Sequence, residues 1–411
     1  MIKRLKSLDK SMLIYLCIIA LTALGVGLSN DVLSNYFKEA YKVTTFERGF
    51  IEFPRELPGV CVIFVMAGLS LLPDIRISML SQLLSIIGIA TLGFFTPSFS
   101  VMLIFIFINS MGMHLFMPLQ DSIGMSLIKE GHLGKKMGQF KGITTAFSMF
   151  ASLFVFIGFR MGFFSFTTKI KWIFICSAFF LFIVFLLMFL LERNVHESIR
   201  SNKKIKFIFR KEYKYYYILV VMFGVQKQMM IVYGPWMLIE LVGKGADTLA
   251  ILGMLGSFVG IFFIPAIGRW LDRFGIKAIL YADALSFIGV YLVYGLLSAG
   301  FFSGKLAIIG LPVFLAYALF IVDKMSNQLG MVRTIYLRTI AVDPSDVTPT
   351  LSLGLSIDHV VSITCAFLGG IVWTYWGPQY IFFLASALSC VNLYVAFKVK
   401  NIEKPQVSLD N

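Results

Sequence analysis

Long apolar runs constrain this chain more than any other feature of its sequence. A helix that spans a bilayer needs about 20 consecutive apolar residues, and the sequence offers about twelve such runs over most of its length. The runs are continuous, whereas membrane-spanning β-strands show alternating segments of about ten residues. The sequence therefore predicts an all-α integral membrane protein without a sizeable soluble domain.

The expected spanning helices follow one another at short intervals. They cover 11–37, 46–72, 75–95, 99–128, 137–161, 170–191, 214–241, 247–270, 276–299, 305–338, 350–374 and 377–397. The first run follows a basic segment, as the apolar part of a signal peptide does, but it is too long for one. We therefore interpret it as the first spanning helix.

Composition excludes several other classes of protein. Only 14% of the residues are charged, against about a quarter in soluble proteins. The five cysteines lie in or beside apolar runs without a Cys-x-x-Cys or Cys/His cluster, so we expect neither disulfides nor a metal site. The sequence lacks a Gly-x-x-x-x-Gly-Lys-Ser/Thr phosphate loop, which argues against ATP hydrolysis, and nothing in it indicates a cofactor.

The most polar connector separates the sixth and seventh runs and carries eight Lys and Arg residues between Glu192 and Lys214. It divides the chain into two halves of six helices. The predicted domains are an N-terminal bundle at 1–191, a cytoplasmic basic connector at 192–213, a C-terminal bundle at 214–400 and a cytoplasmic tail at 401–411.

The basic residues of the loops predict the orientation. With both termini on one side, that side receives 24 of the 36 Lys and Arg residues and the opposite side 8. Because cytoplasmic loops are enriched in Lys and Arg, both termini are expected in the cytoplasm of a multi-pass protein of the plasma (inner) membrane. The net charge of +14 then reflects topology and anionic lipid, and not a nucleic-acid partner.

The loop between the eighth and ninth runs, Gly268–Lys277, reads Gly-Arg-Trp-Leu-Asp-Arg-Phe-Gly-Ile-Lys. Its order resembles the loop signature of the major facilitator superfamily, and a degenerate first-half copy lies at Gly68–Arg76. The resemblance implies two pseudo-symmetric six-helix bundles around a central cavity, alternating access and a monomer. It also implies a cytoplasmic gate at Asp74, Arg76, Gly268, Asp272, Arg273 and Gly275.

Ionisable residues in the first half are candidates for function, because a charge at the bilayer centre costs about 2.5 kcal/mol or more. Asp31 and Asn35 are four residues apart and are expected on one helix face. The segment 52–56 places two carboxylates and Arg55 on one face, as either a salt bridge between helices or a solute-binding or gating site. His114 is either hydrogen-bonded to a neighbouring helix or a proton carrier.

In the second half, Lys227 lies about 13 residues into its helix, roughly 20 Å deep, and is expected to contact solute or a carboxylate. One hypothesis pairs it with Asp323 across the bundle. Asp358 precedes His359, and adjacent residues of a helix do not face each other, so the partner of each is expected on another helix. Asp283 is expected in packing or an interhelical hydrogen bond.

Two sets of candidates result. The substrate-binding candidates are Asn30, Asp31, Asn35, Arg55, Glu56, His114, Gln226, Lys227, Gln228, Trp236, Asp323, Asn327, Gln328 and Arg333. The proton-coupling candidates are Asp31, Glu52, Glu56, His114, Asp121, Asp323, Asp358 and His359.

The leading hypothesis is a secondary active transporter of a small polar organic solute, proton-coupled and working by alternating access, and not an enzyme. The alternatives are a drug or metabolite exporter of the same superfamily and, from another class, a non-transporting receptor or a membrane enzyme on this fold. The sequence does not identify the solute, the coupling ion or the direction of transport.

Overall fold

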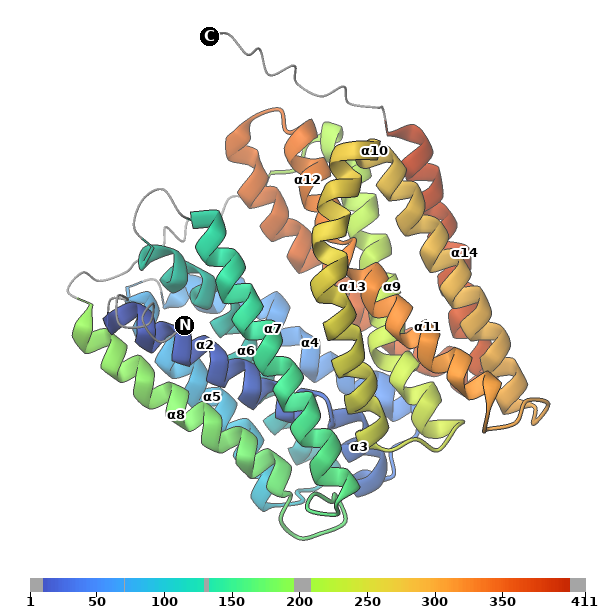
Figure 1. Ribbon diagram of the computed structural model, residues 1–411, viewed down its shortest axis with the longest axis horizontal. Helices are drawn as coiled ribbons and strands as arrows, with labels where there is room; N and C mark the ends of the chain where they lie inside the picture. Colours follow the sequence, from blue (N-terminus) through green and yellow to red (C-terminus); the bar gives the residue numbers. More distant parts are fainter. Residues whose placement is uncertain (1–9, 70, 129–132, 196–207, 400–411) are drawn as a thin grey trace. The chain divides into compact units, whose positions relative to one another are not determined.

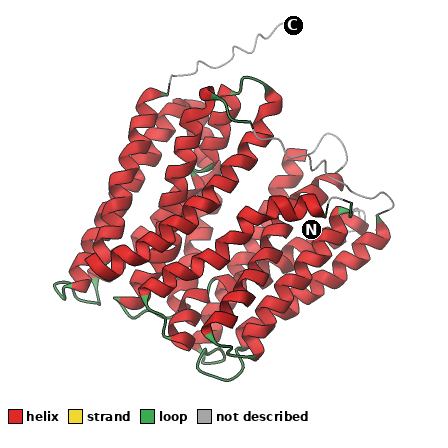
Figure 2. Ribbon diagram, turned by 180° about the vertical axis from the view of Figure 1, so that it is seen from behind, coloured by secondary structure: helices red, strands yellow, loops and turns green. Residues whose placement is uncertain are grey.

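A computed structural model describes residues 10–69, 71–128, 133–195 and 208–399 (Figure 1). Within these ranges every regular element is a helix (Figure 2). Nine helical stretches of the described chain are long and apolar enough to cross a membrane. The predicted all-α membrane architecture is confirmed, while the count of twelve spans stays a prediction.

The first half forms seven helices. Their bounds are α2 Lys10–Asn30, α3 Leu33–Tyr41, α4 Thr45–Gly68, α5 Asp74–Phe94, α6 Phe99–Ser126, α7 Leu133–Arg160 and α8 Trp172–Asn194. The start of α4 shows why a helix begins where it does. Thr44 and Glu47 form a capping box, in which the Thr44 hydroxyl accepts from the Glu47 amide and the Glu47 carboxylate accepts from the Thr44 amide.

The second half contains six α-helices and two short 3-10 helices. Their bounds are η1 Lys211–Tyr213, α9 Lys214–Glu240, α10 Ala246–Phe302, α11 Leu311–Gln328, α12 Met331–Ile340, η2 Pro344–Asp346, α13 Val347–Trp376 and α14 Pro378–Lys398. The 57 residues of α10 include a sharp break at Gly275, whose φ of 80° and ψ of 168° are open to glycine and strained for other residues. The break lies inside the predicted helix-to-helix connection at 268–277.

Two predicted helices are interrupted. The helix expected at 11–37 breaks between Asn30 and Leu33, where the Val32 amide bonds to the Ser29 carbonyl over three residues instead of four. Asp31 therefore lies in the break, and the prediction that it shares a continuous helix face with Asn35 is wrong. The helix expected at 305–338 begins only at Leu311 and breaks again before Met331.

The described chain divides into two compact units. Unit 1 comprises Met1–Ile205, Pro235–Phe258 and Ala366–Ile371, and unit 2 comprises Lys206–Gly234, Val259–Cys365 and Val372–Asn411. The predicted domain boundaries stay a prediction. Parts of the predicted connector (196–207), the tail 401–411 and the basic start 1–9 lie outside the described residues.

Unit 1 is held together by close helix packing. A Cβ atom on Gly112 of α6 would lie 2.3 Å from the Ser81 carbonyl oxygen of α5, so only glycine permits this approach. Asn109 of α6 donates a hydrogen bond of 3.2 Å to the Ser85 carbonyl of α5. Small residues thus bring two backbones together and allow a buried amide to join them.

Unit 2 has an apolar core around its tyrosines. The core includes Tyr213, Tyr216, Leu280, Leu337 and Val395, all of them buried. The buried hydroxyl group of Tyr213 is hydrogen-bonded within this core: it donates to Asp346 at 2.7 Å and accepts from the Val342 amide at 3.0 Å. These bonds connect the start of α9 to the segment between α12 and α13.

Candidate functional site

Each unit contains a cluster of buried charged side chains, and the cluster of unit 1 lies on α4. Glu52 is fully buried, and its Oε1 accepts from the guanidinium groups of Arg48 and Arg55, each at 2.6 Å. Arg48 is 1% exposed and also donates to the Ser34 hydroxyl of α3 at 3.2 Å. The spacing i, i+4, i+7 puts all three residues on one helix face.

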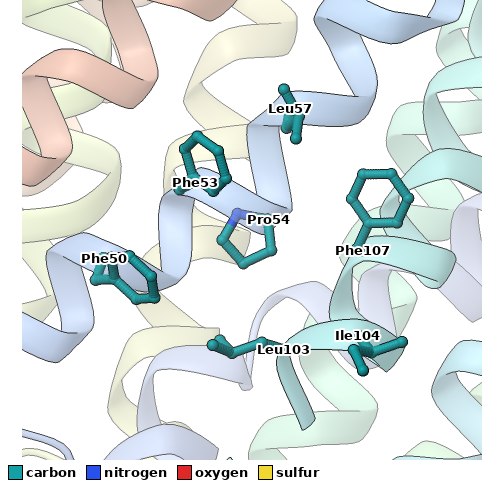
Figure 3. A pocket seen from close by; sticks show the side chains of 7 residues that line it. All are labelled: Phe50, Phe53, Pro54, Leu57, Leu103, Ile104 and Phe107. Carbon is teal, nitrogen blue, oxygen red and sulfur yellow. The ribbon is translucent and has the colours of Figure 1, made fainter. Parts of the chain in front are cut away.

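The opposite face of α4 is apolar. It meets α6 at a small pocket of about 230 Å³ (Figure 3). The pocket is lined by Phe50, Phe53, Pro54, Leu57, Leu103, Ile104 and Phe107. A lining without polar groups does not suit a polar solute, so we assign this pocket to helix and lipid packing and not to the site.

On the α6 side of the cluster, His114 accompanies the charges of α4. The Ser110 hydroxyl donates to the Arg55 carbonyl, and His114 Nδ1 lies 2.9 Å from the Ser110 carbonyl oxygen. A Glu56 carboxylate oxygen and a His114 ring nitrogen lie within 4.8 Å of each other. The predicted candidates Glu52, Arg55, Glu56 and His114 are therefore brought together, with a carboxylate and an imidazole close enough to share a proton through one water.

Other first-half candidates hold the Pro235–Phe258 segment within unit 1. Asn35 donates to the Lys244 carbonyl at 3.3 Å, and the buried Trp236 donates to the Thr45 hydroxyl at 2.8 Å. Asp31 instead accepts from Ser152 of α7 at 2.6 Å. Asn30 and Asp121 are exposed.

The cluster of unit 2 joins helices that are far apart in the sequence. Lys227 of α9 forms an ion pair with Asp358 of α13, with side chains 21% and 10% exposed. The hypothesis that Lys227 pairs with Asp323 is therefore wrong. Asp358 faces Lys227 at a position where α13 approaches α9 closely, since a Cβ on Gly224 would meet Asp358 Oδ1 at 2.9 Å.

Asp323 has a different set of partners. Its side chain is 2% exposed, and it accepts from the Tyr291 hydroxyl at 3.2 Å and from Asn327 Nδ2 at 2.8 Å. Tyr291 also donates to the Gln226 carbonyl at 2.7 Å, which links Asp323 to α9. The carboxylate is thus held by neutral donors.

Gln226 belongs to a buried amide network. Its Nε2 donates to Ser389 at 2.6 Å, and its Oε1 accepts from Asn392 at 3.1 Å. The network explains Gln226 as an interhelical hydrogen-bonding group. Among the remaining candidates Gln228 and His359 are buried, whereas Gln328 is exposed.

Arg333 of α12 completes the cluster. It is 4% exposed, its guanidinium carbon lies 3.5 Å from the centroid of the Phe223 ring, and its Nη1 lies 3.5 Å from Asp283 Oδ2. Asp283, which we had expected in packing or an interhelical hydrogen bond, is thus the nearest carboxylate to Arg333. Lys227, Phe223, Arg333, Asp358 and Asp283 together form the ion cluster of unit 2.

The two copies of the loop signature differ in their contacts. In the first copy Asp74 is fully buried and accepts from Ser122 at 2.8 Å, while Arg76 pairs with Glu192 at 2.5 Å. In the second copy Asp272 and Arg273 are exposed, and no hydrogen bond or ion pair joins the Asp272 side chain to another described residue. The first copy holds three helix ends of unit 1 together, and their role as a gate stays a prediction.

The sequence reasoning missed several participants. Arg48 was not among the candidates, although it lies in the predicted helix at 46–72 and its i, i+4 spacing to Glu52 was visible in the sequence. Tyr291, Ser389 and Asn392 carried no signal, because a tyrosine, serine or asparagine in an apolar run is common and their partners lie 32 to 166 residues away.

Comparisons with known proteins fit this architecture. The family model of the Major Facilitator Superfamily matches residues 15–350. No curated protein sequence matches the chain. The nucleoside transporter NupG has a similar structure, with a TM-score of 0.74 at 13% identity, covering 95% of this chain and 100% of that one.

Two other solved structures are similar. The POT family transporter PepTSo has a TM-score of 0.72 at 12% identity, over 95% of this chain and 98% of that one. A bacterial homologue of the iron transporter ferroportin has a TM-score of 0.71 at 14% identity, over 95% and 99%. At such identities the similarity shows the fold alone.

The match to the family model places this multi-pass helical protein in the class of membrane transporters and not of enzymes. This chain belongs to the Major Facilitator Superfamily, whose model matches most of its length. The resemblance that the loop signature indicated is therefore confirmed.

Proposed function

We propose that this chain is a secondary active transporter that moves a small polar organic solute by alternating access and couples the movement to protons. The Lys227–Asp358 ion pair carries the proposal. A lysine and a carboxylate at membrane depth are costly, and such residues typically mark a solute or ion pathway. The side chains of the pair are 21% and 10% exposed, which leaves them open to a solute or a proton in the proposed mechanism.

Proton coupling is supported by the chemistry of the two clusters. Protonation of Asp358 would release Lys227, and protonation of His114 would strengthen its attraction to Glu56. Either event changes the charge that a solute meets. We therefore propose these residues, with Asp323, as the first candidates for proton binding, in a monomer of the plasma membrane whose termini are cytoplasmic.

The first experiment is a thermal-unfolding screen of the purified, detergent-solubilised protein. Sugars, amino acids, peptides, organic anions, nucleosides and cationic drugs would each be added at about pH 5.5 and about pH 7.5, on either side of an ordinary histidine pKa. A solute at 100 times its Kd stabilises the folded state by about 2.7 kcal/mol. Hits would then be tested for uptake into proteoliposomes with and without an inward proton gradient.

The matched variants are Lys227→Ala and Asp358→Asn against Lys305→Gln, an exposed residue of unit 2 outside the loop signature. We expect the first two to abolish uptake while the folded protein is retained, and the third to transport normally. Uptake that is unchanged in Lys227→Ala would overturn the assignment of the site. A protein that transports none of these solutes at either pH would contradict the transporter proposal.

A further inference from the structure

The guanidinium of Arg333 has the least satisfied donors of the ion cluster of unit 2. Its side chain is 5% exposed, yet neither Nη1 nor Nη2 donates a hydrogen bond to any described residue. The distance of 3.5 Å to Asp283 exceeds the roughly 2.7–2.9 Å of a charge-assisted bond. Asp283 Oδ1 also lacks a hydrogen-bond partner among the described residues. The pair attracts electrostatically but leaves its donors unused.

An aromatic contact, and not a hydrogen bond, holds the terminal nitrogens of this guanidinium. One face lies on the Phe223 ring, at 3.5 Å from its centroid. A Cβ atom on Gly330 would lie 2.5 Å from Nη2, so the small residue makes room for the group. A planar fork that is ordered by stacking is prepared to donate two parallel hydrogen bonds to one acceptor group.

The charges around Arg333 favour a monoanion. Lys227 and Arg333 face Asp358 and Asp283, and Asp358 is close enough to interact electrostatically with Arg333. Two cations and two carboxylates sum to zero charge, so a bound dianion would leave two uncompensated negative charges in the cluster, whereas a monoanion would leave one. The partial exposure of Lys227 and Asp358 shows that the cluster reaches the surface of the unit beside Arg333.

We propose that Arg333 binds a carboxylate group of the transported solute, so that the substrate class is that of organic acids. This inference rests on the proposed function and narrows it. The two oxygens of a carboxylate match the two terminal nitrogens of the fork, and a neutral amide of the same shape accepts only through one oxygen. Asp283 positions the guanidinium and does not touch the solute.

The test uses pairs of small monocarboxylates and their amides as probes, for example lactate with lactamide, propionate with propionamide and benzoate with benzamide. Thermal unfolding of the full-length protein is measured against the concentration of each. We expect at least one monocarboxylate to raise Tm while its amide does not. Its apparent Kd should rise at least tenfold in Arg333→Gln and should be unchanged in Arg338→Gln, an exposed arginine of the same helix.

Arg333→Gln leaves Asp283 buried without its cation and can fail to fold. The double variant Arg333→Gln/Asp283→Asn removes both charges and keeps the test decisive. Loss of the carboxylate response in the folded double variant supports the proposal, and a retained response overturns it. Arg333→Lys, which keeps the charge but not the fork, should give an intermediate Kd.

Failure of this inference is distinguishable from failure of the proposed function. Proteoliposome uptake of a neutral or cationic solute that proceeds at the wild-type rate in the double variant would overturn carboxylate binding and leave transport intact. Absence of uptake and of any thermal shift in the wild-type protein would overturn both.

Discussion

The ion clusters of the two units are built differently. In unit 1 one helix supplies Arg48, Glu52 and Arg55, and a single carboxylate oxygen accepts from both guanidinium groups at 2.6 Å. In unit 2 the pairs join different helices, and both terminal nitrogens of Arg333 lack a hydrogen-bond partner among the described residues. In unit 1 the terminal nitrogens of Arg48 are bonded and only its Nε lacks a partner among the described residues.

The difference separates stability from binding. A charge cluster whose members satisfy one another fixes the helix that carries it, whereas one with unused donors retains the capacity to bind a ligand or a proton. We therefore expect substitutions in α4 to act mainly on folding and those in the ion cluster of unit 2 mainly on solute binding.

The largest expected effect is that of Glu52→Gln. It removes the carboxylate that neutralises Arg48, which is 1% exposed, and the stability of the protein should fall by about 3–5 kcal/mol. Unfolding in detergent would measure the loss. Glu47→Gln in the same helix is the control, because glutamine also serves at this position of the capping box. A loss equal to that of the control would refute the structural role of Glu52.

Asp283→Asn tests the ion cluster of unit 2. It should lower the free energy of unfolding by about 2 kcal/mol, less than Glu52→Gln does, because this carboxylate is not hydrogen-bonded to Arg333. The same unfolding measurement applies. If Asp283→Asn destabilises as much as Glu52→Gln, then the two clusters are equally structural and the distinction drawn above is wrong.

Gly275→Ala should cost about 1–3 kcal/mol, because a positive φ combined with an extended ψ is a conformation that essentially only glycine adopts without strain. Gly268→Ala is the matched control in the same loop signature: neither glycine has atoms near an added Cβ, and only Gly275 has a positive φ. Equal stabilities of the two variants would show that the backbone conformation of Gly275 is not what the signature requires.

The smallest effect concerns an exposed carboxylate. The Ser345 amide donates to Asp343 at 2.8 Å and lowers the pKa of Asp343 below its usual value. Because the folded-state pKa is lowered, the stabilisation is present above about pH 4 and is lost as the pH falls through the folded pKa. Asp343→Asn should lack this pH-dependent increment. Unfolding curves of both proteins between about pH 6 and about pH 3 would detect the difference.

Much of the fold was predictable from the sequence, because membrane-spanning helices are set by apolar length alone. The described helices fall on the predicted apolar runs. The exceptions are local. No proline or glycine marks the break at Asp31–Val32, whereas the late start of α11 had a signal, since Gly310 has a φ of 71° and Pro312 occupies the first turn.

The candidate site was predictable in its residue types and less so in its pairings. Lys227 and Asp358 were both identified as costly membrane charges, but 131 residues separate them, and no periodicity relates residues of different helices. The pairing within the cluster of α4 was easier to predict, because Arg48, Glu52 and Arg55 lie within two turns of one helix. The orphaned donors of Arg333 depend on distances of tenths of an ångström, which no sequence pattern encodes.

The turn at Gly275 has a topological consequence. As a single straight rod, the 57 residues of α10 would be about 86 Å long, nearly three times the hydrocarbon thickness of a bilayer. Each crossing reverses the side on which a chain emerges, so the break adds one reversal to the path. Whether the backbone turns at this one residue thus decides on which side of the membrane each connection of the downstream chain, from α11 to the C-terminus, lies.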